Sequence, residues 1–216
     1  VAILTGDYLF AKSSLLLAEL GPDAVRHQAM TFERLVVGQI METEGPQGSE
    51  EPLTHYLKVV AEKTGSLFGL CARYGGYLSG AKAEIVETLV AFSEELGIAF
   101  QLADDVIDIE SSSNQSGKTP GTDLREGVPT LVTLLVQQMN RSEDARLLSL
   151  LAGAITSESE VTFALDQLRI HPALDEAKKI TMQYAESARK MLGTLPLNGT
   201  TEGLLSLCDA LVSRSA

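Results

Sequence analysis

The chain has 216 residues, of which 44% are hydrophobic and 21% are charged, with a formal net charge of −12. This composition is typical of one globular domain with a sizeable core, and it excludes a disordered or fibrous chain. The acidic balance disfavours nonspecific binding to nucleic acid and to anionic membrane surfaces. An acidic protein that binds an anion must supply positive charge locally, from a metal ion or from a few placed Lys and Arg side chains.

The two cysteines, Cys71 and Cys208, form neither a metal-binding spacing nor a disulfide framework. This usage is typical of a reducing compartment and predicts a cytoplasmic protein. No stretch has the length and apolarity of a transmembrane helix, and residues 1–4 carry no signal-peptide pattern. Because the chain starts without Met and is already apolar, we expect that its natural N-terminal part is absent from this sequence.

Helical patterns follow one another along the whole chain. Residues 6–20 are small or apolar on most faces, as in a buried helix, and apolar positions recur at helical intervals over 23–44. Pro52 opens a long helix to about residue 78, and another helix is expected over 81–109. A polar loop is expected over 111–127, and further helices over 129–138, 143–156, 158–170, 172–192 and 202–213. No alternating strand pattern occurs, so the sequence predicts an all-α bundle with a buried centre.

Three aspartates lie together near the end of the expected helix 81–109. Asp104 and Asp108 share one helical face, with Asp105 beside them and Gln101 one turn earlier. Like charges at this spacing repel by a few tenths of a kcal/mol per pair. Carboxylates without nearby His or thiolate ligands suit a hard cation, and Mg²⁺ is the usual one when a substrate supplies phosphate oxygens. The alternative is a solvated acidic face, which the apolar neighbours disfavour.

Two lysines are candidates for binding an anion. Lys63, followed by Thr64, lies in the middle of the helix 52–78, where a lysine is costly unless its ammonium reaches a partner or a cavity. A lysine that extends to the surface is the alternative. Lys118 lies in a segment of Gly, Pro and small hydroxyl residues, a composition that can surround a phosphate. The same segment has no Walker spacing and is equally typical of an ordinary connection.

Several short motifs follow one another along the chain. They are Gly6-Asp7-Tyr8-Leu9-Phe10-Ala11, Gly38-Gln39, Lys63-Thr64-Gly65, Phe100-Gln101 with Asp104-Asp105-Val106-Ile107-Asp108, and Gly117-Lys118-Thr119-Pro120-Gly121-Thr122-Asp123. In this order they resemble the motifs of the trans-isoprenyl diphosphate synthases, and the chain resembles medium- and long-chain bacterial members of that family. The aspartates resemble the second aspartate-rich motif of the family. A lone DDxxD pattern is weak, but the set of motifs in this order is specific, and it extends to about Thr133.

The resemblance implies a single, N-terminally incomplete polyprenyl synthase domain over residues 1–216, with an isoprenoid synthase-type helical bundle and a central apolar cavity. It implies a Mg²⁺-dependent prenyltransferase that condenses isopentenyl diphosphate with an allylic diphosphate, such as farnesyl or geranylgeranyl diphosphate. Ionisation, condensation and elimination would give a longer trans-polyprenyl diphosphate. A homodimer is implied, without nucleic acid and without stable membrane insertion.

The resemblance also implies roles for the residues that bind substrate. Lys63 and Lys118 would bind the allylic diphosphate. Thr64 and Gln101 would stabilise the carbocation through their oxygen dipoles, and we expect these four residues to be catalytic. Phe100 would border the isopentenyl diphosphate site, where an aromatic face near a cation is favourable by about 0.5–2 kcal/mol.

By the same resemblance, Asp104 would hold Mg²⁺, with Asp105 and Asp108 completing the acidic cluster directly or through water. The first aspartate-rich motif of the family, with its arginines, would lie upstream of Gly6-Asp7-Tyr8-Leu9, so we expect the active site of this chain to be incomplete. Val128 stands where many members have a further diphosphate-binding lysine.

Two other functions agree with the same pattern. A non-catalytic partner subunit of a heteromeric synthase would share the fold, although a scaffold has no need of a complete set of Lys-Thr, Gln and aspartate residues. A class I terpene cyclase would share the fold and the metal chemistry. Such cyclases usually carry an additional Asn/Ser/Glu metal motif, and the later helices show none.

Overall fold

The computed structural model describes residues 1–110 and 120–214, and this part of the chain contains helices and no strand. The prediction of an all-α protein is confirmed for these residues. The helices are α1 (Ala2–Ala18), α2 (Pro22–Glu44), α3 (Pro52–Val60), η1 (Ala61–Gly65), α4 (Ser66–Leu78), α5 (Ala83–Glu110), α7 (Thr122–Glu126), α8 (Leu131–Met139), η2 (Ser142–Asp144), α9 (Ala145–Leu150), α10 (Glu158–Arg169), α11 (Pro172–Leu192) and α12 (Gly199–Arg214).

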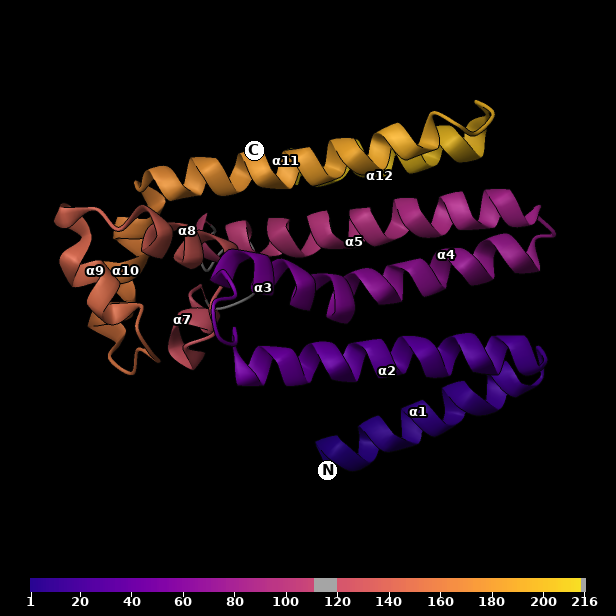
Figure 1. Ribbon diagram of the computed structural model, residues 1–216, viewed down its shortest axis with the longest axis horizontal. Coiled ribbons are helices and arrows are strands. Elements are labelled where there is room, and N and C mark those ends of the chain that lie inside the picture. The colour runs from indigo at the N-terminus through magenta and orange to yellow at the C-terminus, as the bar shows by residue number, and fades with distance from the viewer. Residues whose placement is uncertain (111–119, 215–216) are drawn as a thin grey trace.

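The long helices lie side by side along the molecule, and the short helices gather at one end (Figure 1). In this view α4 lies between α5 and α2, α1 forms the lower edge, and α11 with α12 covers α5 from the other side. The acid-bearing end of α5 points toward the short helices α7 and α8. None of the helices in the described ranges is long and apolar enough to cross a membrane.

Three of the helices begin at a proline. The fixed φ of proline suits the first position of a helix, and its missing N–H would have no partner there. Pro22, Pro52 and Pro172 are the first residues of α2, α3 and α11. Glu51 caps α3 by accepting hydrogen bonds from the backbone N–H groups of Leu53 and Thr54, and the ring of His171 caps α11 by accepting one from the backbone N–H of Ala173. The helix starts expected at these prolines are therefore confirmed.

The long helix expected over residues 52–78 is present, but it contains a π-helical turn. α3 and α4 are joined by η1, which comprises Ala61–Gly65 and includes both Lys63 and Thr64. A π turn inserts one extra residue into a helix and so rotates the side chains that follow relative to those before it. Sequence periodicity did not predict this change, which decides where Lys63 and Thr64 point.

Three expectations about the elements are wrong. Residues 6–20 were expected to form a buried helix, but no residue of α1 is buried. The helix is apolar on most faces, and α2 covers only part of it. The expected loop contains the short helix α7. Gly121 precedes this helix and Gly127 follows it, both in left-handed conformations, with φ of 74° and 70°. The helix expected over 143–156 ends at Leu150.

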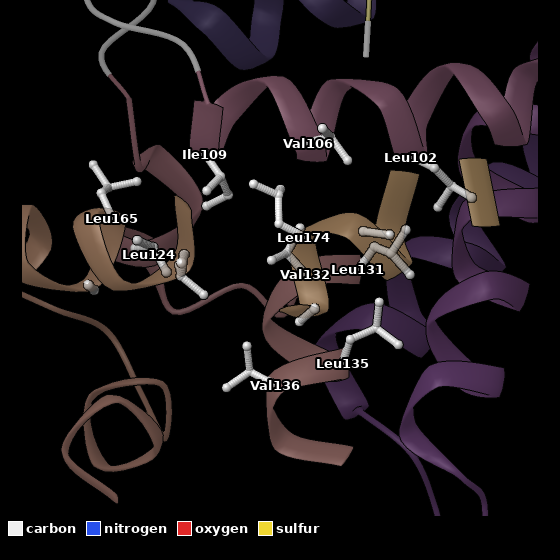
Figure 2. Packing of buried hydrophobic residues seen from close by; sticks show 14 of the residues in the cluster. Leu102, Val106, Ile109, Leu124, Leu131, Val132, Leu135, Val136, Leu165 and Leu174 are labelled. Carbon is white, nitrogen blue, oxygen red and sulfur yellow. The ribbon is translucent and has the colours of Figure 1, made fainter. Parts of the chain in front are cut away.

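The main core lies at the end of the bundle that holds the acidic motif (Figure 2). Its fully buried members include Leu102 and Val106 of α5 and Leu131, Val132 and Val136 of α8. Leu124 of α7 and Leu174 of α11 close the cluster. Each large apolar side chain buried in this way contributes about 1.5–3 kcal/mol. This packing fixes α7 and α8 against the end of α5, and so fixes the walls of the candidate site.

Candidate active site

A cavity of about 260 Å³ opens where η1, α5, α7 and the start of α8 meet. Its lining residues are Glu42, Tyr56, Val59, Val60, Lys63, Thr64, Gln101, Asp105, Asp123, Glu126, Val128, Pro129 and Thr130. Four of the predicted site residues therefore meet in one cavity, although they come from separate parts of the sequence. Among the described residues that line it, Lys63 is the only cation, and it faces four acidic side chains.

Lys63 extends into this cavity from η1. Its Nζ donates to Oε2 of Glu42 at 2.6 Å, and both side chains are about 30% exposed. The ammonium thus has the partner that its position in an apolar helix requires. Sequence analysis missed Glu42, because nothing in its local pattern distinguishes it from the other acidic residues of α2. An anion that binds Lys63 must compete with this carboxylate.

A chain of hydrogen bonds joins η1 to the acidic motif of α5. The hydroxyl of Thr64 donates to Oε1 of Gln101 at 3.3 Å, and Nε2 of Gln101 donates to Oδ1 of Asp105 at 3.1 Å. Gln101 and Asp105 are four residues apart on one helix, so their side chains are neighbours. The two residues expected to direct oxygen dipoles at a cation, Thr64 and Gln101, are therefore in contact.

Asp105 faces the protein interior. Its Oδ2 accepts hydrogen bonds from the hydroxyl of Tyr56 and, at 3.0 Å, from the backbone N–H of Leu131, the first residue of α8. Burial raises the pKa of the Asp105 carboxyl to about 6, and the hydrogen bonds from Tyr56, Leu131 and Gln101 oppose that rise. Among the described residues, Oδ1 accepts only the hydrogen bond from Gln101, so it keeps one lone pair for a metal ion or a water molecule. Direct coordination by Asp105 therefore stays a prediction, as does contact through water.

Tyr56 is a second residue that sequence analysis missed. It comes from α3, and burial, followed by the charge of Asp105, raises the pKa of its phenol well above the ordinary value. The phenol therefore remains a donor to Asp105 at neutral pH. Nothing in the sequence around Tyr56 distinguishes it from the other aromatic residues, because its partner is 49 positions away.

Asp123 of α7 brings a further carboxylate to the site. Burial raises its pKa to about 6, and repulsion from Asp108, Asp105, Glu126 and Asp104, in that order, adds to the rise. The carboxylates of α5 and α7 therefore lie close enough to repel one another. Neutralisation by a proton or by a cation relieves this repulsion.

The donor set suits a hard divalent cation, because carboxylate oxygens are the ligands that Mg²⁺ and Ca²⁺ prefer. In the part of the chain that the structure describes, no three His, Cys, Asp or Glu side chains stand close enough to hold an ion by themselves. This agrees with a site in which substrate oxygens and water complete the coordination. The roles of Asp104, Asp105 and Asp108 as metal ligands remain predictions.

Phe100 is a predicted substrate-binding residue that does not line the cavity. Phe100 is 36% exposed on α5 and lies against Phe68 of α4, with ring centroids 5.5 Å apart and planes tilted by 40°. Lys118 lies outside the described residues. Val128 lines the cavity and adds no charge to it.

Comparison with known proteins agrees with this geometry. The profile of the polyprenyl synthetase family matches residues 1–168. The chain is 49% identical over 214 residues to nonaprenyl diphosphate synthase from Mycobacterium tuberculosis, and the match covers 99% of this chain and 64% of that protein. It is also 31% identical to component 2 of heptaprenyl diphosphate synthase from Geobacillus stearothermophilus, with 94% of this chain and 63% of that protein covered.

Solved structures show the same architecture. Geranylgeranyl pyrophosphate synthase from Corynebacterium glutamicum, complexed with calcium and isoprenyl diphosphate, superposes with a TM-score of 0.88 at 37% identity, covering 100% of this chain and 67% of that chain. The fold is therefore the all-α isoprenoid synthase fold, and the chain belongs to the polyprenyl synthetase family. It spans about 64% of the length of its M. tuberculosis relative.

Proposed function

We propose that this chain forms the larger part of a prenyltransferase that condenses isopentenyl diphosphate with an allylic diphosphate to give a longer trans-polyprenyl diphosphate. The observation that carries the proposal is the cavity in which Lys63, Thr64, Gln101 and Asp105 meet. The name of the M. tuberculosis relative supports a long-chain product. Related structures that hold calcium and isoprenyl diphosphate support a divalent cation, for which we propose Mg²⁺.

In this proposal Lys63 holds the diphosphate of the allylic substrate, and Lys118 contributes a second positive charge. The bond between the allylic carbon and the diphosphate oxygen breaks, and its electron pair leaves with the diphosphate. The oxygens of Thr64 and Gln101 face the resulting allylic cation. The double bond of isopentenyl diphosphate then forms the new carbon–carbon bond, and loss of a proton restores the double bond.

The charges of the cavity explain why a metal is needed. Among the described residues that line it, four side chains are acidic and the only ammonium is that of Lys63, which is itself paired with Glu42. A diphosphate would meet net repulsion there unless divalent cations neutralised the carboxylates. When bound between the aspartates and the substrate, Mg²⁺ would offset the charge that develops on the leaving diphosphate. We propose Asp104 as its main ligand, with Asp105 and Asp108 completing the acidic cluster directly or through water.

We also propose that the enzyme is a cytoplasmic homodimer that pairs through α1 and α2. These helices expose many large apolar side chains, which include Leu4, Leu9, Leu16, Met30, Phe32, Val36 and Ile40. Apolar surface of this extent on a monomer usually marks an interaction site. Light scattering should give the mass of a dimer, and Leu9→Asp should shift it toward a monomer. A monodisperse monomer at micromolar concentration would contradict this arrangement.

A prenyl-transfer assay tests the proposed activity. The natural protein that contains this chain, with Mg²⁺, isopentenyl diphosphate and farnesyl or geranylgeranyl diphosphate, is expected to form a longer diphosphate, and EDTA should abolish this product. Separation of radiolabelled products by chromatography gives both the rate and the chain length. A folded natural protein that makes no product alone would contradict the proposal and favour a partner subunit of a heteromeric synthase, a function that similarity to component 2 of a heptaprenyl synthase supports.

A further inference from the structure

One face of α2 contacts the π-helical turn η1 at three successive positions. Arg34, Gly38 and Glu42 are four residues apart and so lie on one side of the helix. Glu42 accepts the hydrogen bond from Lys63, as described above. Arg34 and Gly38 belong neither to the cavity lining nor to the acidic motif, yet they contact Glu62 and Lys63 in the same turn.

Arg34 joins η1 to both neighbouring long helices. Its Nε donates to Oε2 of Glu62 at 2.8 Å and its Nη2 to Oε1 of Glu62 at 3.2 Å, so the pair is bidentate. Its Nη1 donates to Oε1 of Glu94, on α5, at 2.5 Å. A planar guanidinium is suited to holding two carboxylates in fixed directions, whereas an ammonium is not. Arg34 therefore fixes the residue next to Lys63 relative to α2 and α5 together.

Glycines let the three helices come this close. A Cβ at Gly38 would lie 2.9 Å from Cγ of Lys63 and 2.9 Å from Cβ of Glu62, and a Cβ at Gly97 would lie 3.0 Å from Cα of Gly65. The π turn is thus held between backbone surfaces of α2 and α5. Residues held at such short range have little freedom to move independently.

We infer that Arg34 is a positioning residue for catalysis. By holding Glu62 and Glu94 together it keeps the π turn in the geometry that aims Lys63 and Thr64 into the cavity. Arg34 itself does not line the cavity, so it acts through these two residues. This inference rests on the proposed prenyl-transfer function, in which Lys63 and Thr64 contact the diphosphate and the cation.

The test compares Arg34→Met with Arg73→Met. Arg73 on α4 forms a similar bidentate pair with Glu87 of α5, at 2.7 and 2.9 Å, but lies outside the π turn and the cavity. Arg34→Met is expected to lower kcat at least tenfold, because a misaimed Thr64 weakens contact with the cation formed during reaction. It is also expected to raise KM for the allylic diphosphate at least threefold, because a misaimed Lys63 weakens contact with the diphosphate. Arg73→Met should stay within twofold of wild type.

Two further variants separate positioning from general loss of structure. Arg34→Lys, which restores charge but not the bidentate geometry, should recover only part of kcat. In a Thr64→Ala background, Arg34→Met should lower kcat less than threefold, since the residue through which it acts is already lost. Full additivity of the two substitutions, or equal kinetics for Arg34→Met and Arg73→Met, would overturn the inference.

Amide hydrogen exchange provides a measurement that does not depend on turnover. Exchange at residues 61–65 should be at least tenfold faster in Arg34→Met than in Arg73→Met, and Mg²⁺-dependent binding of inorganic pyrophosphate should weaken at least threefold. Unchanged exchange and binding would overturn the positioning role even if the wild-type chain made no product. A wild-type chain without product contradicts the proposed function, whereas an active enzyme indifferent to Arg34→Met contradicts this inference alone.

Discussion

Asp104→Ala is expected to lower prenyl transfer by about 100- to 1,000-fold, the usual effect of removing one group that stabilises charge in a transition state. Asp104 is the first acid of the motif on α5, and its charge raises the pKa of both Asp105 and Asp123. It is therefore close to the other carboxylates that would share a cation. Initial rates at saturating Mg²⁺ and substrate measure the effect.

The matched control is Glu84→Ala, which removes an exposed acid from the first turn of the same helix. It should retain activity within twofold. Titration calorimetry with inorganic pyrophosphate should show that Asp104→Ala also raises the Mg²⁺ concentration needed for binding. An Asp104→Ala enzyme with wild-type rate and wild-type Mg²⁺ dependence would rule out Asp104 as a metal ligand.

Asp105→Ala is expected to lower the free energy of unfolding by about 3–4 kcal/mol at pH 7, because it leaves buried donors on Tyr56 and Leu131 without their acceptor at a cost of about 1–3 kcal/mol each. These donors tie α3 and the start of α8 to α5. Asp105→Asn keeps an acceptor and avoids burying a charge, so it should cost less than about 1 kcal/mol. Urea denaturation of the metal-free protein gives both values.

Asp166→Ala is the control, because Asp166 forms an exposed ion pair with Arg169 on α10. Removing such a pair should change the free energy of unfolding by less than about 1 kcal/mol. If Asp105→Ala were no more destabilising than Asp166→Ala, the hydrogen-bond network around Asp105 would not hold the three helices together.

The same carboxyl predicts a pH dependence. The folded-state pKa of Asp105, about 6, lies above its ordinary value of 3.8, so the folded protein binds this proton more tightly than the unfolded chain. The contribution of this proton to the free energy of unfolding is complete below about pH 4. It is lost as the pH rises through about 6, and the loss is on the order of 2–3 kcal/mol. The pKa of Asp123 is raised as well, so this carboxyl contributes to the pH dependence in the same direction. Asp105→Asn should flatten the slope between pH 4 and 7 in EDTA, and an unchanged slope would contradict the shift.

The all-α fold and most helix positions were evident from the sequence, because apolar periodicity and the prolines at helix starts are local signals. Lys63, Thr64, Gln101 and Asp105 were predicted from the sequence as site residues, and the structure places them in one cavity. A lysine or a run of acids in an apolar helix is conspicuous, since burying such groups without partners is costly.

The tertiary structure alone decided which partners these residues have. Spacing places Asp104, Asp105 and Asp108 on one side of a helix, but neighbouring positions differ by about 100°, and only packing against α3 and α8 turns Asp105 inward to Tyr56 and Leu131. Glu42 is far from Lys63 in sequence, so no local pattern reveals their pairing. The π turn likewise depends on contacts across α2, η1 and α5, because local helical periodicity does not encode close approach between distant helices.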